Sequence, residues 1–244
     1  MRVVLLAAGR ATRLQPLTDA LPKCLLEVGG ESILARLLRT LADRGLRRFT
    51  VVDGFMGDLL RERITAKFPS EWFTFVRNDV YATTNNSYSL FLARYACDEP
   101  MLLSDADILF EPAVIDRLLA DSHDNRLVLR TRGSIGEEEM KVVLDGRGTV
   151  ANIAKDVPPS TATGESVGLE VFSARFTAKL FSTLERRMLV EKRVNEWYEA
   201  SFVELIRAGE VVHPIDIGKL QSMEVDTLED LERARQIFGQ GEPP

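Results

Sequence analysis

Residues 3–18 read Val-Val-Leu-Leu-Ala-Ala-Gly-Arg-Ala-Thr-Arg-Leu-Gln-Pro-Leu-Thr, and Pro-Lys-Cys-Leu-Leu follows at residues 22–26. The opening run of valine and leucine is typical of a strand buried in a parallel sheet. It ends in Ala7-Ala8-Gly9, where small side chains let another molecule approach the backbone. Arg13 and Lys23 then add two cations. Backbone N–H groups and fixed positive charge beyond a strand end indicate a binding site for an anion such as a polyphosphate.

The spacing of this segment excludes two common phosphate-binding motifs. The G-x-x-x-x-G-K-[ST] pattern of a P-loop is absent. The dinucleotide fingerprint is absent as well, because Ala11 stands where its second glycine would be.

The pattern L-A-A-G-x-x-T-R-L-x-P-L-T, followed by P-K-x-L, resembles the signature of nucleotidyltransferases that activate sugar phosphates and related phosphate esters. Ala11 departs from it, because many members carry glycine there. The resemblance implies catalytic roles for Lys23, which would bring the two reacting phosphates together, and for Arg13, which would hold the departing β,γ-phosphates. It also implies nucleotide binding by Leu6, Ala7, Ala8, Gly9, Arg10, Thr12 and Arg13.

Size and composition narrow the class of protein. The chain has 244 residues, of which 45% are hydrophobic, so it can bury a sizeable core in one large α/β domain or two small ones. Its net charge of −6 indicates neither a nucleic-acid surface nor a membrane partner. We expect no membrane span and no signal peptide. Cys24 and Cys97 suggest no disulfide framework, so we also expect a cytoplasmic location. Cys24 is interpreted as a small buried residue, with a reactive thiol as the alternative. His123 and His213 are too few for a histidine-rich metal site and are interpreted as surface or loop residues.

Strands and helices alternate in the first half of the chain. The expected strands are 3–6, 49–52, 73–76 and 101–103; the expected helices run from residue 32 to near Gly45, through Leu59 to Ile64, and over 87–96. This order predicts an α/β fold, a single-domain, doubly wound, Rossmann-like mixed and mostly parallel sheet with helices on both faces, of the nucleotide-diphospho-sugar transferase type. Ligands of such sheets bind beyond the carboxyl ends of the strands.

The second half predicts a different arrangement. A hairpin joins strands 141–144 and 150–154 through Asp145-Gly146-Arg147-Gly148, and further strands are expected at 167–172, 211–215 and 223–225. Helices are expected at 174–190 and 195–208, with a last one after Asp226. No linker divides the chain, so we expect one nucleotidyltransferase domain over 1–238, with a nucleotide-binding half (1–130) and an acceptor-binding, sheet-completing part (131–226). Residues 239–244 are expected to form a flexible tail.

Three aspartates are candidates for a Mg²⁺ site. Asp105 and Asp107 follow an apolar strand, and residues i and i+2 of a strand point the same way. Paired carboxylates beside a polyphosphate site suit a hard cation, although two solvated loop aspartates are the simpler reading. Asp226 also follows a strand and could instead be the N-cap of the last helix. The resemblance implies that Asp107 and Asp226 are the metal ligands, with Asp105 as the next candidate, and it leaves open whether Asp105 or Asp107 is the principal ligand. It also implies that Asp105 contacts the nucleotide.

Asn85-Asn86-Ser87-Tyr88-Ser89 is a good helix start, and it also matches a segment of the cytidylyltransferase branch that lines the nucleotide and acceptor pocket. The match implies nucleotide contacts for Asn86 and Ser89, and acceptor contacts for Asn85 and Tyr88. Asn78 is a further candidate near the base, although Asn-Asp is common in turns.

Lys155, Glu170 and Trp197 are candidates for the acceptor site. The resemblance implies that Lys155 neutralises the acceptor phosphate; a solvated strand-end lysine is the alternative. Glu170 alternates within an apolar strand and could face a cationic substrate group. Trp197-Tyr198 could hold an ammonium, although core packing is favoured. Glu137-Glu138-Glu139 is interpreted as a solvated loop.

Over the whole chain the resemblance is closest to bacterial enzymes similar to CTP:phosphocholine cytidylyltransferase, including relatives that act on aminoethylphosphonate or inositol phosphate. It implies Mg²⁺-dependent transfer of the NMP of an NTP, CTP foremost, to a small phosphorylated or phosphonate acceptor with release of pyrophosphate. Leu220-Gln221-Ser222-Met223 lacks an aromatic residue expected in many relatives, which argues against a choline-type cage. The alternatives are a sugar-1-phosphate nucleotidylyltransferase using UTP, dTTP or GTP, a metal-dependent glycosyltransferase, and a non-catalytic regulatory subunit. The sequence leaves open whether the chain forms a homodimer.

Overall fold

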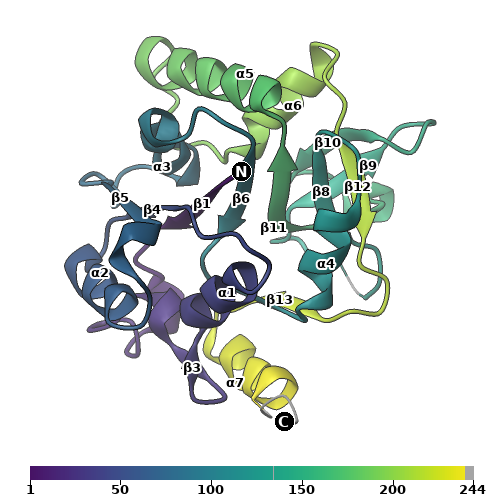
Figure 1. Cartoon of the computed structure of the whole chain (residues 1–244). Coiled ribbons are helices and arrows are strands. Elements are labelled where there is room, and N and C mark those ends of the chain that lie inside the picture. The colour runs from purple at the N-terminus through teal and green to yellow at the C-terminus, as the bar shows by residue number, and fades with distance from the viewer. Residues whose placement is uncertain (134, 240–244) are drawn as a thin grey trace.

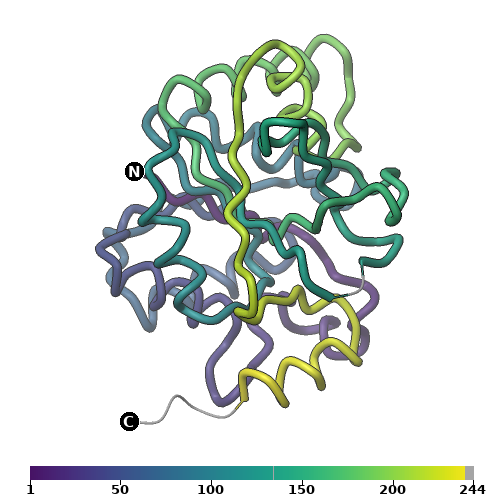
Figure 2. Tube along the Cα trace, turned by 90° about the vertical axis from the view of Figure 1, so that its right-hand side faces the viewer, coloured from purple at the N-terminus to yellow at the C-terminus, as the bar shows by residue number. Residues whose placement is uncertain are grey.

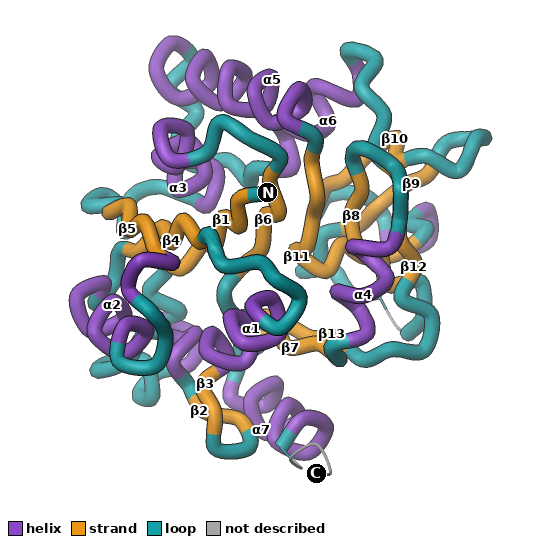
Figure 3. Tube along the Cα trace, in the orientation of Figure 1, coloured by secondary structure: helices purple, strands orange, loops and turns teal. Residues whose placement is uncertain are grey.

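The first half of the chain builds the parallel part of a central sheet. We describe a computed structural model, which covers residues 1–133 and 135–239. A nine-stranded sheet has the main order β10-β9-β11-β6-β1-β4-β5 (Figures 1 and 3). In it β1 (Arg2–Ala7) lies between β6 (Met101–Asp105) and β4 (Phe49–Asp53), parallel to both, and β4 continues to β5 (Phe73–Arg77). The carboxyl ends of these strands therefore meet at one edge.

The second half adds mostly antiparallel strands around one long strand. β11 (Gly164–Phe172) pairs antiparallel with β6, with β8 (Arg126–Arg130) and with β9 (Lys141–Leu144). β9 forms the expected hairpin with β10 (Val150–Ala154), and β12 (His213–Asp216) runs parallel to β8. The register of β11 against β8 shifts between Ser166 and Glu170, where Gly168 has a φ of 73°. This irregularity lets β11 serve different neighbours along its length.

Side-chain alternation along β1 divides the core into two layers. Val3 and Leu5 pack on one face with α1 (Ile33–Ala42), α2 (Gly57–Thr65) and α4 (Ala113–Ala120). Val4 and Leu6 pack on the other face with α3 (Asn86–Leu92), α5 (Ala174–Glu185) and α6 (Glu199–Arg207). In Figure 1 the second group of helices lies above the strands and the first below them. Each fully buried valine or leucine contributes about 1.5–3 kcal/mol relative to an exposed one.

The last helix returns to the N-terminal loop. α7 (Leu228–Phe238) buries Leu231, Ala234 and Phe238 in a third apolar cluster together with Leu14 and Leu26 of residues 12–26. Figure 2 shows this yellow helix beside the purple N-terminal segments. The chain reaches it through β13 (Ser222–Glu224), which pairs with β7 (Ile108–Phe110) in a separate small sheet, while β2 (Glu27–Val28) pairs with β3 (Glu31–Ser32). This packing fixes the C-terminal part of the chain against the N-terminal loop.

The expected fold class is confirmed, and the differences are local. β2, β3, β7 and β8 were not expected, the helix after residue 174 changes to a π-helical turn at Arg186–Val190, and α6 begins later than expected, at Glu199. The N-cap of α7 is Thr227, which forms a capping box with Asp230, so the N-cap alternative for Asp226 is wrong by one residue. Of the predicted tail only Gly239 lies within the described residues. No described helix combines the length and the apolar character that a membrane span requires.

Candidate active site

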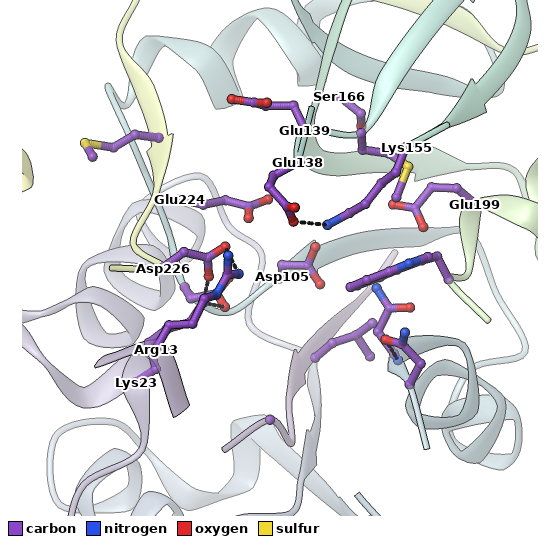
Figure 4. A pocket seen from close by; sticks show the side chains of 18 of the residues that line it. Arg13, Lys23, Asp105, Glu138, Glu139, Lys155, Ser166, Glu199, Glu224 and Asp226 are labelled. Carbon is purple, nitrogen blue, oxygen red and sulfur yellow. Dashed lines mark hydrogen bonds and ion pairs between the residues drawn. The ribbon is translucent and has the colours of Figure 1, made fainter. Parts of the chain in front are cut away.

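A cavity of about 590 Å³ opens at the carboxyl edge of the parallel strands (Figure 4). Its walls come from the ends of β1 and β6, from the start of α3 and from β13 and the loop before α7, and also from the loop before β9, from Lys155 just after β10, from β11 and from the start of α6. The predicted residues that line it are Leu6, Ala8, Gly9, Arg13, Lys23, Asn78, Asn85, Asn86, Ser89, Asp105, Asp107, Lys155, Trp197 and Asp226. Segments that are far apart in the sequence thus meet in one hollow.

A cation held by two carboxylates occupies one end of this cavity. Nζ of Lys23 lies 2.5 Å from Oδ2 of Asp107 and 2.5 Å from Oδ1 of Asp226. Nη2 of Arg13 lies 2.7 Å from the other oxygen of Asp226. Burial alone would lower the pKa of Lys23, but the charges of Asp107 and Asp226 raise it above its ordinary value. Burial likewise acts to raise the pKa of Asp226, and Lys23 reverses this, so that its pKa is lowered.

Local structure explains how Lys23 reaches this place. Pro22 precedes a short 3-10 turn at Lys23–Leu25, in which the N–H of Leu25 donates to the carbonyl of Pro22 at 2.9 Å. Cys24 and Leu25 are buried and anchor the turn. Burial raises the pKa of Cys24 to about 12, which agrees with the interpretation of a small buried residue rather than a reactive thiol.

The carboxylate pair fits a divalent metal. Asp107 and Asp226 converge on one positive charge and have oxygen ligands, which Mg²⁺ prefers. Among the residues that the structure describes, no group of three or more histidine, cysteine, aspartate or glutamate side chains could hold a metal alone. A site of this kind would be completed by substrate phosphates and water, which is the usual arrangement for Mg²⁺ in proteins.

Asp105 also lines the cavity, but its hydrogen-bond partner differs from that of Asp107. β6 ends at Asp105, and residues 106 and 107 form a turn before β7, so the expectation that strand alternation aligns Asp105 with Asp107 is wrong. Oη of Tyr198 donates to Oδ2 of Asp105 at 3.2 Å. Burial and then the charge of Asp107 hold the pKa of Asp105 well above its usual range. Gly168 leaves room for this carboxyl group, since a Cβ there would lie 2.9 Å from Oδ2 of Asp105.

The asparagines that line the cavity are engaged in internal hydrogen bonds. Nδ2 of Asn78 donates to Oγ of Ser89 at 3.0 Å and to Oγ1 of Thr84 at 3.3 Å, while Oδ1 accepts from the N–H of Val80 at 3.1 Å. Asn78 therefore braces the wall of the cavity. Asn85 caps α3 as expected, and Oδ1 of Asn86 accepts from the N–H of Tyr198 at 3.1 Å.

Lys155 and Trp197 form a contact within the cavity. Nζ of Lys155 lies 4.3 Å from the centroid of the Trp197 ring and 3.9 Å from Oε2 of Glu138. Trp197 is 42% exposed and Tyr198 is fully buried, so core packing is right for the tyrosine and wrong for the tryptophan.

The acidic loop before β9 is not simply solvated, as the sequence had suggested. Glu138 and Glu139 line the cavity. The fully buried Lys141 donates from Nζ to the carbonyl oxygens of Gly136, Glu137 and Glu139, at 3.3, 2.8 and 3.1 Å. These bonds hold the loop over the site.

Glu170 does not line the cavity. It is 1% exposed, and Oε1 accepts a hydrogen bond of 3.4 Å from Oγ of Ser166. It faces inward as expected, and its hydrogen-bond partner Ser166, rather than Glu170 itself, lines the cavity. Glu199 and Glu224 line the cavity instead. Neither was singled out from the sequence, where nothing distinguishes them from solvated glutamates.

Four other predicted residues also lie away from the main cavity. Ala7 lines a smaller hollow of about 110 Å³ that lies beside Lys23. The Arg10 guanidinium lies 5.7 Å from the centroid of the Phe55 ring. Thr12 begins the 3-10 turn Thr12–Leu14, and Tyr88 packs on Phe91 with ring centroids 5.7 Å apart. None of these four residues lines the main cavity.

Residues 3–236 match the model of the MobA-like NTP transferase domain. The chain belongs to this family. The sequence-based prediction of a nucleotidyltransferase is thereby confirmed, and the enzyme class follows from the family.

Individual relatives of this nucleotidyltransferase have informative names. It is 25% identical, over 95% of its length and 98% of the relative's, to the CTP:phosphoglutamine cytidylyltransferase of Campylobacter jejuni. It is 38% identical over 49% of its length to a CMP-5'-(3-aminopropyl)phosphonate synthase of Streptomyces rubellomurinus, but the match covers only 19% of that longer protein. The inositol-1-phosphate CTP transferase from T. maritima has a similar fold, with a TM-score of 0.81, 21% identity, and coverage of 100% of this chain and 98% of the other.

Proposed function

We propose that this nucleotidyltransferase transfers CMP from CTP to a small phosphate or phosphonate acceptor in a Mg²⁺-dependent reaction that releases pyrophosphate. The observation that carries the proposal is the contact of Lys23 with both Asp107 and Asp226, beside the Ala8-Gly9 loop that the sequence predicts to bind phosphate. The names of the relatives support CTP as donor and a phosphorylated or phosphonate acceptor, in the class of phosphocholine, aminoethylphosphonate or inositol phosphate.

The reaction needs no general base. An acceptor phosphate or phosphonate carries an ionised oxygen at neutral pH, and this oxygen attacks the α-phosphorus in line. The bond from the α-phosphorus to the bridging oxygen breaks, and pyrophosphate leaves with that oxygen's electron pair. The barrier comes from bringing anions together, so positioning and charge neutralisation supply the catalysis.

The residues of this chain divide that task. Lys23 lies between the phosphate-binding loop and the cavity, where its ammonium can contact the α-phosphate and the incoming oxygen. Arg13 is 55% exposed at its side chain and can turn from Asp226 to the β,γ-phosphates. Asp107 and Asp226 would hold Mg²⁺, which would neutralise charge on the α-phosphate and the leaving group. Lys155 lies toward the other side of the cavity and would bind the acceptor phosphate (Figure 4).

The experiment is a matrix of CTP, UTP, GTP and dTTP against phosphocholine, 2-aminoethylphosphonate, inositol phosphate and hexose 1-phosphates, with pyrophosphate release as readout. We expect turnover with CTP and one class of small acceptor, and none without Mg²⁺. Preferential turnover of a hexose 1-phosphate with UTP, dTTP or GTP would overturn the choice of donor and acceptor. No turnover in any combination would favour the non-catalytic subunit.

Two expectations about the cellular form remain proposals. Cys24 and Cys97 are both free and buried, which is consistent with the reducing cytoplasm we propose as its location. A homodimer is a further proposal, to be tested by the mass of the protein in solution.

A further inference from the structure

Glu199 is a buried carboxylate inside the cavity with an unused hydrogen-bonding oxygen. It is 5% exposed, is the first residue of α6 and lines the cavity. Its Oε2 atom has no hydrogen-bond partner among the residues that the structure describes. A buried acceptor atom without a donor destabilises the folded chain, and more so when the group is charged. Glu199 is therefore prepared for a donor that the folded chain does not supply.

The nearest candidate inside the protein does not fill this role. Lys155 is close enough for its charge to lower the pKa of Glu199, against the larger effect of burial, which raises that pKa to about 7. Its ammonium, however, lies over the ring of Trp197 and beside Glu138. No ion pair joins Lys155 to Glu199 among the described residues. The carboxylate remains without a matching cation.

The surroundings of Glu199 favour a positive ligand. The carboxyl groups of Asp105 and Glu170 are near enough for Glu199 to act on their pKa values. In Figure 4, Glu199 lies across the cavity from Arg13 and Lys23, with Asp105 between them. The cavity thus has Arg13 and Lys23 at one end for the nucleotide phosphates. At the other end Glu199 lies beside Lys155, where Lys155 would bind the acceptor phosphate and Glu199 is available for another part of the acceptor.

The aromatic residues of the cavity do not form a cage. In the described part of the chain its aromatic lining consists of Tyr81 and Trp197. A face of Trp197 already carries the ammonium of Lys155, and Tyr81 packs against Phe55 with ring centroids 6.2 Å apart. A quaternary ammonium needs aromatic faces and has no N–H to donate. A primary ammonium has three N–H donors and meets the need of the unpaired oxygen.

We propose that Glu199 recognises a primary ammonium group on the acceptor, so that the preferred acceptor is an aminoalkyl phosphate or phosphonate. This inference rests on the proposed function and narrows its acceptor class. Glu199 is a specificity-determining residue in this account, and it takes no part in the transfer itself.

The test uses three acceptors that share a phosphate and a two-carbon linker: 2-aminoethyl phosphate, phosphocholine and 2-hydroxyethyl phosphate. For wild type with CTP and Mg²⁺ we expect kcat/KM for the primary amine to exceed the other two values at least 30-fold. Glu199→Gln keeps the size of the side chain and the helix but removes the charge. In this variant kcat/KM for 2-aminoethyl phosphate should be within threefold of kcat/KM for 2-hydroxyethyl phosphate. The KM for CTP should stay within twofold. Glu185→Gln, an exposed glutamate of α5 outside the cavity, should keep the amine preference.

Equilibrium binding of the same three compounds, by calorimetry with wild type and Glu199→Gln, makes the test independent of turnover. The inference is supported if wild type binds the primary amine more tightly than the other two compounds and Glu199→Gln does not. Pyrophosphate release with equal or better use of phosphocholine or 2-hydroxyethyl phosphate overturns it and leaves the proposed function standing. An amine preference that survives in Glu199→Gln overturns it as well. Selective amine binding without turnover of any NTP overturns the proposed function and keeps the ammonium site.

Discussion

Nζ of Lys23 lies 2.5 Å from Oδ1 of Asp226, although 203 positions separate the two residues in the sequence. The contact exists because α7 packs on the N-terminal loop and carries the preceding segment with it. The proposed catalytic cation and two of the proposed metal ligands are thereby held together in the folded chain.

Replacing Lys23 by Ala should lower kcat at least 1,000-fold, since no other described side chain contacts both Asp107 and Asp226. The variant should also lose about 1–3 kcal/mol of unfolding free energy, because two half-buried carboxylates lose their shared cation. Mg²⁺ should restore part of this loss. We expect Mg²⁺ to raise the Tm of the variant more than that of wild type. Lys179→Ala, which removes a surface partner of Glu210, is the control. An equal rise in Tm on addition of Mg²⁺ for wild type and Lys23→Ala would show that Lys23 and the metal do not share Asp107 and Asp226.

Asp107→Asn and Asp226→Asn should each reduce kcat at least 100-fold at fixed Mg²⁺, because an amide is a weaker ligand than a carboxylate for a hard cation. The Mg²⁺ concentration needed for half-maximal activity should rise in both. It should stay unchanged in Asp116→Asn, which alters an exposed ion pair with Arg44. A normal Mg²⁺ requirement in either site variant would remove that residue from the metal site.

Gly168→Ala and Gly148→Ala separate backbone strain from contact with Asp105. The two glycines have similar φ values, 73° and 78°. A Cβ at Gly148 meets nothing within 4 Å, whereas one at Gly168 lies 2.9 Å from Oδ2 of Asp105. Both variants should lose about 1–2 kcal/mol from left-handed backbone strain. Only Gly168→Ala should also lose activity, at least tenfold in kcat/KM. Equal activity of the two variants would mean that the position of Asp105 is unimportant.

Stability should depend on pH through Glu199. Burial raises its pKa from the ordinary 4.5 to about 7. Between these values the folded state keeps a proton that the unfolded state has released, so stability falls as pH rises through 7. Glu199→Gln does not titrate, and its unfolding free energy relative to wild type should therefore increase by about 2–3 kcal/mol from pH 5 to pH 8. Urea unfolding at both pH values measures this. An unchanged difference would show that Glu199 is ionised at both.

Ala11→Gly should stabilise the protein by about 0.5–1 kcal/mol. Ala11 has a φ of 51°, a left-handed conformation that suits glycine, the residue many nucleotidyltransferases have at this place. Ala42→Gly lies at the end of a regular helix and should destabilise by a similar amount. Thermal melts of both variants decide the sign. A loss of stability in Ala11→Gly would mean that the alanine methyl makes a contact worth more than the strain.

Local sequence patterns are sufficient to predict the parallel half of the sheet. β1, β4 and β6 are short apolar runs that end in small or acidic residues, and helices with one apolar face separate them. The sequence did not predict β8, because its three apolar residues are flanked by Arg126 and Arg130. The buried Arg126 donates from Nε to the carbonyl of Leu118 at 2.7 Å and from Nη1 to the carbonyl of His123, contacts that the sequence does not reveal.

The residues of the candidate site likewise include some that the sequence predicts and some that it does not. Arg13, Lys23, Asp107 and Asp226 belong to segments with a recognisable pattern, and the fold brings them into contact. The sequence did not reveal Glu199 because burial of a carboxylate depends on distant parts of the chain, and it did not reveal Glu224 because its place in the cavity depends on the pairing of β13 with β7. Glu170 was expected at the acceptor site from strand alternation and from the resemblance of its segment, and neither shows which neighbouring side chains cover it.

The most direct test is the product formed from CTP, Mg²⁺ and 2-aminoethyl phosphate, followed by ³¹P NMR with wild type and with the Lys23→Ala variant. We predict equal amounts of pyrophosphate and of a CMP–acceptor product with a new P–O–P linkage, formed at least 1,000 times more slowly by the variant. Hydrolysis of CTP to inorganic phosphate, or product formation by the variant at the wild-type rate, would contradict the account.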